Sequence, residues 1–121
     1  MFIKRLRAKI HRATVTETDL HYIGSVAIDG DLLDRAGIEA YEWVLVVDVT
    51  NGARFETYVQ PTEPGSGIVC VNGAAAHLVS KGDLIIIFAF GYHNPDDGSV
   101  PEPTLVFVDE KNRPIQLAGK R

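Results

Sequence analysis

The sequence has little of what would point to a membrane-bound, secreted or disulfide-linked protein. Cys70 is the only cysteine among 121 residues, which excludes an internal disulfide and fits a reducing compartment. The longest apolar stretch, residues 84–90, is far shorter than the roughly 20 residues of a membrane-spanning helix. Residues 1–5 are not followed by a long apolar run, so we expect no signal peptide. These features predict a cytoplasmic protein with no membrane partner.

The usual signatures of metal, phosphate and nucleic-acid sites do not occur either. The four histidines, His11, His21, His77 and His93, have no close ligand spacing, and a lone cysteine supplies no second thiolate. There is no P-loop and no G-x-G-x-x-G pattern. The formal net charge of −4 argues against a nucleic-acid partner. We therefore expect no metal site, and we interpret Cys70 as a buried, inert thiol.

What the sequence does contain is a series of short β-strand patterns. Leu6, Ala8 and Ile10 alternate with basic side chains, a period of two that gives a strand one apolar face and one basic face. Two interpretations of the basic face stay open at this point. Either these side chains are simply solvated, or Lys9 and His11 line a pocket for an anion.

The remaining elements fit one domain, 1–121, that is long enough to bury a core. The expected strands are residues 25–28, 43–49, 53–59, 68–71, 84–90 and 104–108, with 114–117 as a further candidate. The strand at 43–49 is almost continuously apolar, which predicts a buried strand. Many short strands with a few short helices predict a mainly β fold, a small closed barrel.

Turn and cap residues separate these strands. A short helix is expected at 32–36, after a start at 29–31 and before a stop at Gly37. Asn51 and Gly52 predict a type I′ hairpin turn. A turn at 72–78 leads into another short helix, whereas 61–67 is an expected loop, 91–103 an expected mobile loop and 118–121 an expected frayed tail.

Gly24 and Ser25 form the dipeptide with the most distinctive chemistry. Taken alone, a Gly-Ser pair is an ordinary turn. The alternative is self-cleavage, in which the serine hydroxyl attacks the preceding carbonyl and the acyl group moves from nitrogen to oxygen. β-Elimination of that ester leaves a new N-terminus that hydrolyses to a pyruvoyl group. Glycine keeps the attacked carbonyl uncrowded, and a hydroxyl such as that of Thr57 would stabilise the oxyanion.

Several motifs in a fixed order carry a family resemblance. They are residues 9–16 (Lys-Ile-His-Arg-Ala-Thr-Val-Thr), 22–25 (Tyr-Ile-Gly-Ser), 51–54 (Asn-Gly-Ala-Arg), 57–58 (Thr-Tyr) and 72–77 (Asn-Gly-Ala-Ala-Ala-His). On these motifs, which extend over most of the chain, the sequence resembles the pyruvoyl-dependent aspartate 1-decarboxylases.

The resemblance implies a precursor that cuts itself between Gly24 and Ser25. The products would be a β chain, 1–24, and an α chain, 25–121, that begins with a pyruvoyl cofactor made from Ser25. It also implies a double-psi β-barrel and a homotetramer with active sites between subunits. The reaction would be decarboxylation of L-aspartate to β-alanine, a precursor of pantothenate and coenzyme A. Unaided cleavage and cleavage triggered by an accessory protein are both compatible with the residues.

Roles carry over from the family to the matching positions. Ser25 would supply the carbonyl that forms a Schiff base with the substrate, and Tyr58 would donate the proton to the carbanion. Lys9 and Arg54 would bind the two substrate carboxylates. The family role of Thr57 is to assist cleavage and touch the substrate. Backbone N–H groups of Gly73, Ala74 and Ala75 would bind an anion, and the expected neighbours are His11, Tyr22 and Asn72.

The sequence departs from the family pattern at one position, and two alternative functions remain open. Val47 stands where some members of the family have a tryptophan near the site, so that contact is absent. A small β-barrel binding module that never cleaves would show the same strand pattern, because a fold does not fix a function. A pyruvoyl enzyme acting on another amino acid is the third reading, although the basic pair Lys9 and Arg54 favours a dicarboxylate.

Overall fold

The computed structural model describes residues 1–23 and 25–116. Its strands are β1 (Ile3–Thr14), β2 (Glu17–Asp19), β3 (Val26–Asp29), β4 (Trp43–Asp48), β5 (Arg54–Thr62), β6 (Val69–Asn72), β7 (Leu84–His93), β8 (Thr104–Val108) and β9 (Pro114–Ile115). An α-helix, α1 (Gly30–Ala36), and two 3₁₀ helices, η1 (Gly73–His77) and η2 (Pro95–Asp97), complete the secondary structure of this part.

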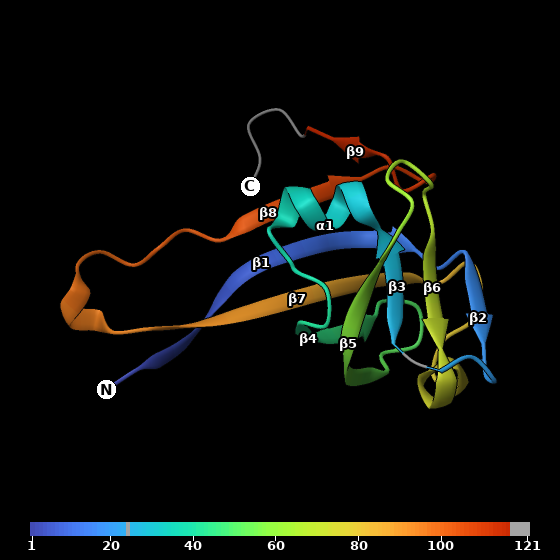
Figure 1. The fold of residues 1–121 in the computed structure, drawn as a ribbon, viewed down its shortest axis with the longest axis horizontal. Coiled ribbons are helices and arrows are strands. Elements are labelled where there is room, and N and C mark those ends of the chain that lie inside the picture. The colour runs from blue at the N-terminus through green and yellow to red at the C-terminus, as the bar shows by residue number, and fades with distance from the viewer. Residues whose placement is uncertain (24, 117–121) are drawn as a thin grey trace.

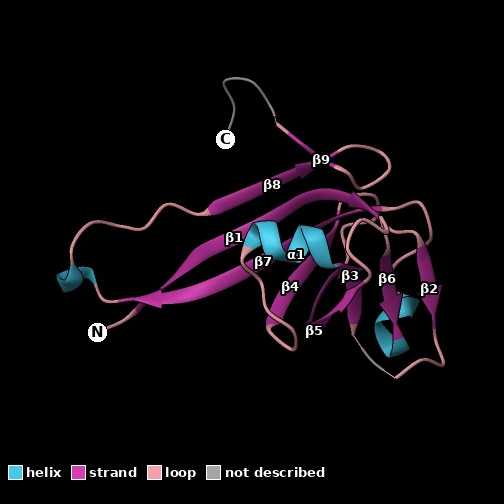
Figure 2. Cartoon of the chain, turned by 45° about the horizontal axis from the view of Figure 1, so that its top comes forward, coloured by secondary structure: helices cyan, strands magenta, loops and turns pink. Residues whose placement is uncertain are grey.

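The strands form one mixed sheet in the order β2-β6-β3-β5-β4-β7-β1-β8-β9. The antiparallel pair β1 and β7 makes a long ribbon that projects to one side (Figure 1). At the opposite end, β3, β6 and β2 stand side by side (Figure 2). The predicted mainly β fold is confirmed, and the sheet is consistent with a double-psi β-barrel. It does not close, however, because the hydrogen-bonded order of the described strands ends at β2 and β9.

Helix α1 begins and ends where the sequence predicted. The Asp29 carboxylate accepts the N–H of Asp31 at 2.9 Å, which satisfies one of the unpaired donors of the first turn. Gly37 ends the helix with a φ of 70°, a left-handed conformation that glycine adopts without strain. Leu32 and Leu33 are buried, and α1 packs against β1, β3 and β8. The helix therefore begins next to the ends of β3 and β5.

Only one side of the long strands is covered in the single chain. On β4, Val44 is buried whereas Trp43 is 60% exposed and Leu45 is half-buried. The prediction of a buried strand at 43–49 is therefore correct for one face only, since alternate side chains point to opposite sides. We call the uncovered side of β1, β7, β4 and β5 the outer face; one row of it consists of Lys9, Phe88, Leu45 and Glu56.

The turn at Asn51 differs from the prediction. Only Gly52 has a positive φ, of 81°, whereas a type I′ turn requires positive φ at both central residues. A buried carboxylate reorganises the connection instead: Asp48 accepts the N–H groups of Thr50 at 2.7 Å and Asn51 at 3.1 Å. These local side-chain bonds add to the backbone bonds that Asp48 makes with Gly52 and Ala53, both at 2.8 Å.

Several element boundaries also differ. Strand β5 continues through Pro61 to Thr62, because β3 pairs with it in parallel over that length. Strand β7 continues to His93 because β1 pairs with it there, so residues 91–93 are not part of a loop. Strand β9 is confirmed at 114–115, whereas residue 117 and the predicted frayed tail at 118–121 lie outside the described residues.

Candidate active site

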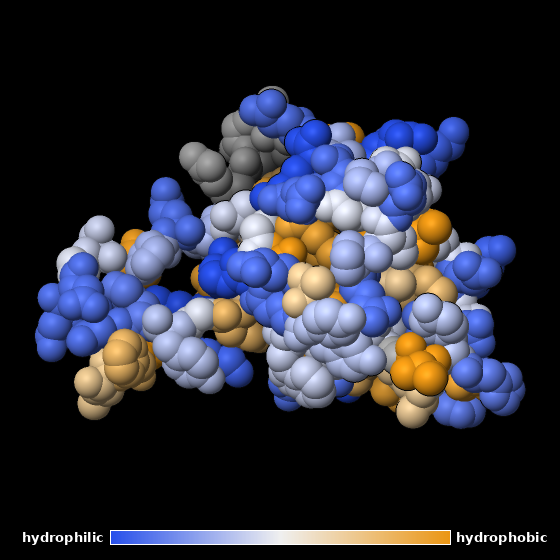
Figure 3. Space-filling model, in the orientation of Figure 1, coloured by the Kyte–Doolittle hydropathy of each residue, from blue (hydrophilic) through white to orange (hydrophobic). Residues whose placement is uncertain are grey.

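Ser25 lies where the chain passes from the surface into the core. Ile23 is 88% exposed, and Ser25, two residues later, is 3% exposed. Apolar side chains mark the surface near the start of β3 and η1 (Figure 3). The carbonyl that the serine would attack belongs to Gly24, which lies outside the described residues. The predicted cut site therefore falls at the boundary between an exposed segment and a buried strand.

The side chain of Ser25 is held without a hydrogen bond. Its backbone carbonyl accepts the N–H of Asn72 at 3.1 Å, and the next residue, Val26, pairs with Val59 of β5 and Val71 of β6. The hydroxyl Oγ is buried and has no partner among the described residues. Buried polar groups are nearly always bonded, so an unpaired hydroxyl calls for an explanation. One explanation is that this hydroxyl acts as a nucleophile on the carbonyl of the preceding residue.

Asn72 connects Ser25 to a thiol. Asn72 is 4% exposed, and its Oδ1 accepts a hydrogen bond from Sγ of Cys70 at 3.0 Å. Burial raises the pKa of the Cys70 thiol, and the negative charges of Glu17 and Asp19 raise it further. The thiol is therefore protonated at neutral pH, as a donor must be. Cys70 is buried, as predicted, and it lies next to the site.

Strand β5 carries three of the predicted residues. Its register with β4 puts Arg54 and Tyr58 on the outer face, whereas Thr57 points toward the core side. Tyr58 directly precedes Val59, whose partner on β3 follows Ser25 in sequence. Tyr58 and Ser25 thus occupy adjacent strands at the same level. Arg54 lies on the same face four residues before Tyr58, with Glu56 between them, and is exposed to solvent.

Lys9 lies on the same outer face but several strands away. Strands β7 and β4 separate β1 from β5, and β3 lies beyond β5. With strand spacings of about 4.8 Å, the backbone of Lys9 is roughly 14 Å along the sheet from β5 and roughly 19 Å from β3. The structure therefore gathers Ser25 and Tyr58 but does not bring Lys9 beside them within the sheet.

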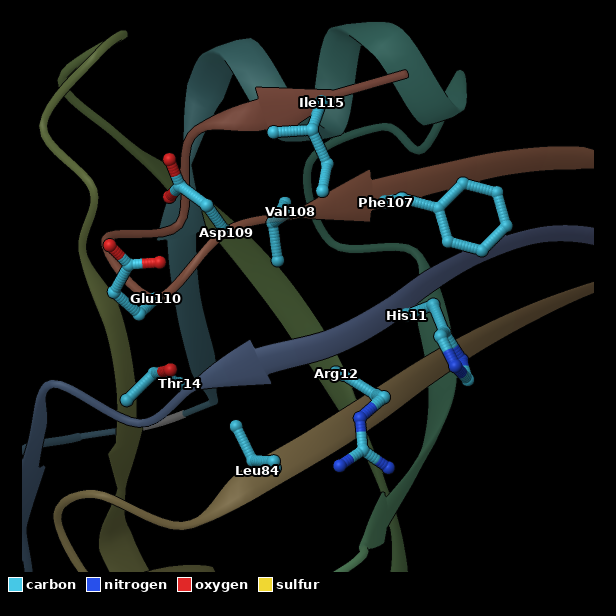
Figure 4. A pocket seen from close by; sticks show the side chains of 9 residues that line it. All are labelled: His11, Arg12, Thr14, Leu84, Phe107, Val108, Asp109, Glu110 and Ile115. Atoms are coloured by element: carbon cyan, nitrogen blue, oxygen red, sulfur yellow. The ribbon is translucent and has the colours of Figure 1, made fainter. Parts of the chain in front are cut away.

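His11 lines a cavity of its own. The cavity, of about 420 Å³, lies between β1 and the turn after β8, and Figure 4 shows His11 beside Phe107. The two rings make an edge contact with centroids 5.7 Å apart, and Nδ1 of His11 is buried without a described partner. Burial lowers the pKa of His11, and the charges of Lys9 and Arg12 lower it further, so the imidazole is neutral at pH 7.

The remaining predicted residues surround Asn72. Tyr22 lines a cavity of about 300 Å³ together with Asn72 and Cys70. Gly73 follows Asn72 with a φ of 64°, and η1 begins there with Gly73, Ala74 and Ala75. Ser25, Tyr58, Tyr22, Asn72 and the start of η1 therefore form one group around the start of β3, which we call the β3 site. Lys9 and His11 lie outside it.

Sequence reasoning missed Tyr41. Its ring lies against that of Tyr58, with centroids 6.1 Å apart and planes at 30°. It has a φ of 67°, a left-handed conformation that the sequence gives no reason to expect at a tyrosine. The position precedes β4 in a turn, so only the folded chain shows which strand it meets.

Residues 1–23 and 25–116 offer neither a metal site nor a membrane-spanning helix. No group of three or more His, Cys, Asp or Glu side chains there is placed to hold a metal ion. Across the same described residues, no helix has the length and apolar character needed to span a membrane.

Comparison with known proteins gives a consistent result. The profile of the family described as aspartate decarboxylase matches residues 1–115. A protein from Acetivibrio thermocellus named aspartate 1-decarboxylase is 54% identical over 120 residues, which cover 99% of this chain and 95% of that relative. The range matched by the family, residues 1–115, spans the β3 site as well as Lys9, His11 and Arg54.

Proposed function

The chain belongs to the aspartate decarboxylase family, and from this premise we propose that it removes the α-carboxylate of L-aspartate as CO₂ and releases β-alanine. The enzyme is a carboxy-lyase that depends on a pyruvoyl group derived from serine, and its product feeds pantothenate and coenzyme A biosynthesis. The observation that carries this proposal is the buried Ser25 hydroxyl, which has no partner in residues 1–23 and 25–116 and which belongs to the Tyr-Ile-Gly-Ser motif.

The surroundings of Ser25 fit a pyruvoyl group. Converting serine to pyruvoyl keeps the carbonyl that accepts the Asn72 N–H and removes the hydroxyl. Because no described residue bonds that hydroxyl, its loss leaves no donor or acceptor unpaired. When formed, the group supplies a conjugated carbonyl that accepts the electrons released as CO₂ departs.

Formation of this group divides the chain at position 24. The Oγ of Ser25 attacks the carbonyl of Gly24, and the products are a 1–24 β chain and a 25–121 α chain. Thr57 assists this step, as its family role implies. It lies on β5, the strand that pairs with β3 directly after Ser25, which supports that assignment.

The other roles follow the chemistry of the side chains. Tyr58 holds the proton that is delivered to the α-carbon after CO₂ leaves, and its position level with Ser25 supports this. Arg54 binds one substrate carboxylate, because its planar guanidinium suits a bidentate contact. Lys9 binds the other. Neither cation forms an ion pair with a described carboxylate, so both charges are available to a dicarboxylic acid.

Polar groups around the β3 site complete substrate binding. The backbone N–H groups of Gly73, Ala74 and Ala75 at the start of η1 bind a substrate oxygen. Asn72, which directly precedes them, lines a cavity together with Tyr22. His11 neighbours Lys9 on β1 and contributes a neutral imidazole.

We further propose that a homotetramer in the cytoplasm is the working form. The outer face carries a half-exposed apolar row on β4 and β7, and Trp43 on β4 is 60% exposed. Burying such a face against another copy contributes roughly 25 cal/mol per Å² of apolar surface. Because Lys9 is roughly 19 Å along the sheet from β3, a neighbouring subunit supplies the Lys9 that completes each site.

Aspartate turnover tests the proposal. Ser25→Ala removes the nucleophile, so the variant should release no CO₂ from L-aspartate. Ser80→Ala, at an exposed serine, is the matched control and should retain wild-type activity. L-glutamate, one methylene longer, should be a poorer substrate by about 1–3 kcal/mol in transition-state binding. Full activity of Ser25→Ala would refute the assignment of the cofactor.

A further inference from the structure

No hydrogen bond of the Tyr41 side chain with the described residues explains the conformation of its backbone. A φ of 67° is uncommon for a residue with a bulky side chain. Asn112, at φ 60°, is different, because its side chain bonds both backbone groups of Thr14 and the carbonyl of Gly67. The Tyr41 side chain makes no hydrogen bond within the described chain and is 70% exposed. Strained residues that persist are held by their surroundings and often serve a function.

Two backbone hydrogen bonds hold the Tyr41 turn against β5. The N–H of Tyr41 donates to the carbonyl of Val59 at 2.8 Å, and the N–H of Val59 donates to the carbonyl of Glu42 at 3.1 Å. Both bonds fall on the residue that follows Tyr58. They fix the turn at the point where the ring of Tyr41 meets the ring of Tyr58.

A second set of contacts fastens the same turn to β1. Arg7 donates to the carbonyl of Gly37 at 2.8 Å and forms an ion pair with the carboxylate of Glu42. The other oxygen of that carboxylate accepts the N–H of Glu39 at 3.0 Å. The turn is therefore held from both sides, and its left-handed residue cannot relax without breaking these bonds.

The rings of Tyr41 and Tyr58 form a packed pair. Their centroids are 6.1 Å apart, within the range of favourable aromatic contacts, and their planes are tilted by 30°. Tyr58 is half-buried, and the ring of Tyr41 covers the solvent-facing side of the Tyr58 ring. We propose that Tyr41 is a positioning residue for Tyr58, which fixes the orientation of the phenol that delivers the proton. This inference rests on the proposed function, in which Tyr58 is the proton donor.

Two variants at one position test the role. Tyr41→Asn keeps a residue that tolerates positive φ but removes the ring. It should lower kcat roughly tenfold, because small displacements of a catalytic group have large effects on rate. KM for L-aspartate should stay within about twofold, and the solvent deuterium isotope effect on kcat should increase as proton delivery becomes limiting. The unfolding midpoint should be unchanged or higher. Tyr41→Phe keeps the ring and should match the wild type in all four measurements.

The outcomes separate this inference from the proposed function. A kcat of Tyr41→Asn within about twofold of the wild type overturns the positioning role. A loss of activity that accompanies a lower unfolding midpoint also overturns it, because the residue would then be structural. If Tyr41→Phe loses as much kcat as Tyr41→Asn, the ring contact is refuted. A wild-type protein that never produces β-alanine would instead contradict the proposed function itself.

Discussion

The buried carboxyl of Asp48 makes a specific prediction about stability and pH. Asp48 is 0% exposed, and its Oδ1 already accepts two backbone N–H groups. Its Oδ2 is buried with no donor among the described residues, and the neighbouring group is the carboxyl of Asp83. Two carboxyls bond only when one of them holds a proton. The folded chain therefore binds a proton at Asp48 more readily than the unfolded chain does.

The surroundings of Asp48 determine the direction in which its pKa changes on folding. Burial raises the pKa of Asp48 above its ordinary value of 3.8, and the adjacent carboxyl of Asp83 raises it further. The N–H groups of Thr50 and Asn51 lower the pKa, and the net change is upward. Below the ordinary value, folded and unfolded chains both hold the proton and the stability is fully present. As the pH rises through the higher pKa of the folded state, stability is lost.

Asp48→Asn removes this dependence. The amide oxygen can accept the same two N–H groups, and the amide nitrogen can donate to Asp83 without a proton from solvent. Each pKa unit of difference corresponds to about 1.36 kcal/mol, and a buried group that regains its partner typically recovers about 1–3 kcal/mol. Near neutral pH the variant should therefore be more stable by that amount, and its unfolding midpoint higher by roughly 4 °C per kcal/mol.

Thermal unfolding followed by circular dichroism, from about pH 4 to about pH 8, measures the effect. A Ser25→Ala background keeps every chain uncut, so that cleavage does not complicate the curves. Asp34→Asn, at an exposed aspartate of α1, is the matched control and should follow the parent protein at each pH. If the Asp48→Asn and parent curves stay parallel throughout this range, Asp48 is not the titrating group and the reasoning fails.

Other substitutions test the hydrogen bonds of Asn112 and the close packing at Gly67. Asn112→Ala removes the bonds to Thr14 and Gly67 and should lower the free energy of unfolding by about 2–4 kcal/mol, measured by urea titration; a loss near zero would mean that water replaces them. Gly67→Ala places a Cβ 2.9 Å from the carbonyl oxygen of Lys111 at a φ of 72°, whereas Gly52→Ala at φ 81° meets nothing within 4 Å. Both substitutions incur backbone strain of about 1–2 kcal/mol, but only Gly67→Ala should add a steric term; equal losses of stability would contradict this.

Local signals in the sequence predicted the elements of the fold well. Asp29 and Gly37 mark the ends of α1 because capping depends on nearby atoms. Alternating patterns placed most strands, since burial of one face imposes a period of two. The type predicted for the turn at Asn51 was wrong because the Asp48 carboxylate, which becomes buried only when the chain folds, bonds the backbone of the turn.

Long-range pairing explains what the sequence could not predict. Nothing near Tyr41 indicates that its turn is held against Val59, or that its ring meets Tyr58. The separation of Lys9 from the β3 site likewise depends on the strand order, in which β7 and β4 come between β1 and β5. The motifs indicate which residues belong to a site. They do not indicate which subunit of an assembly contributes each residue.

The mass spectrum of the purified wild-type chain tests the central claim most directly. We predict two fragments, 1–24 and 25–121, with the larger one lighter by one ammonia than a peptide that begins with serine. Incubation of the Ser25→Ala variant under the same conditions should leave one intact chain. A wild-type preparation that stays at the mass of the uncut 121 residues after prolonged warming would contradict the account.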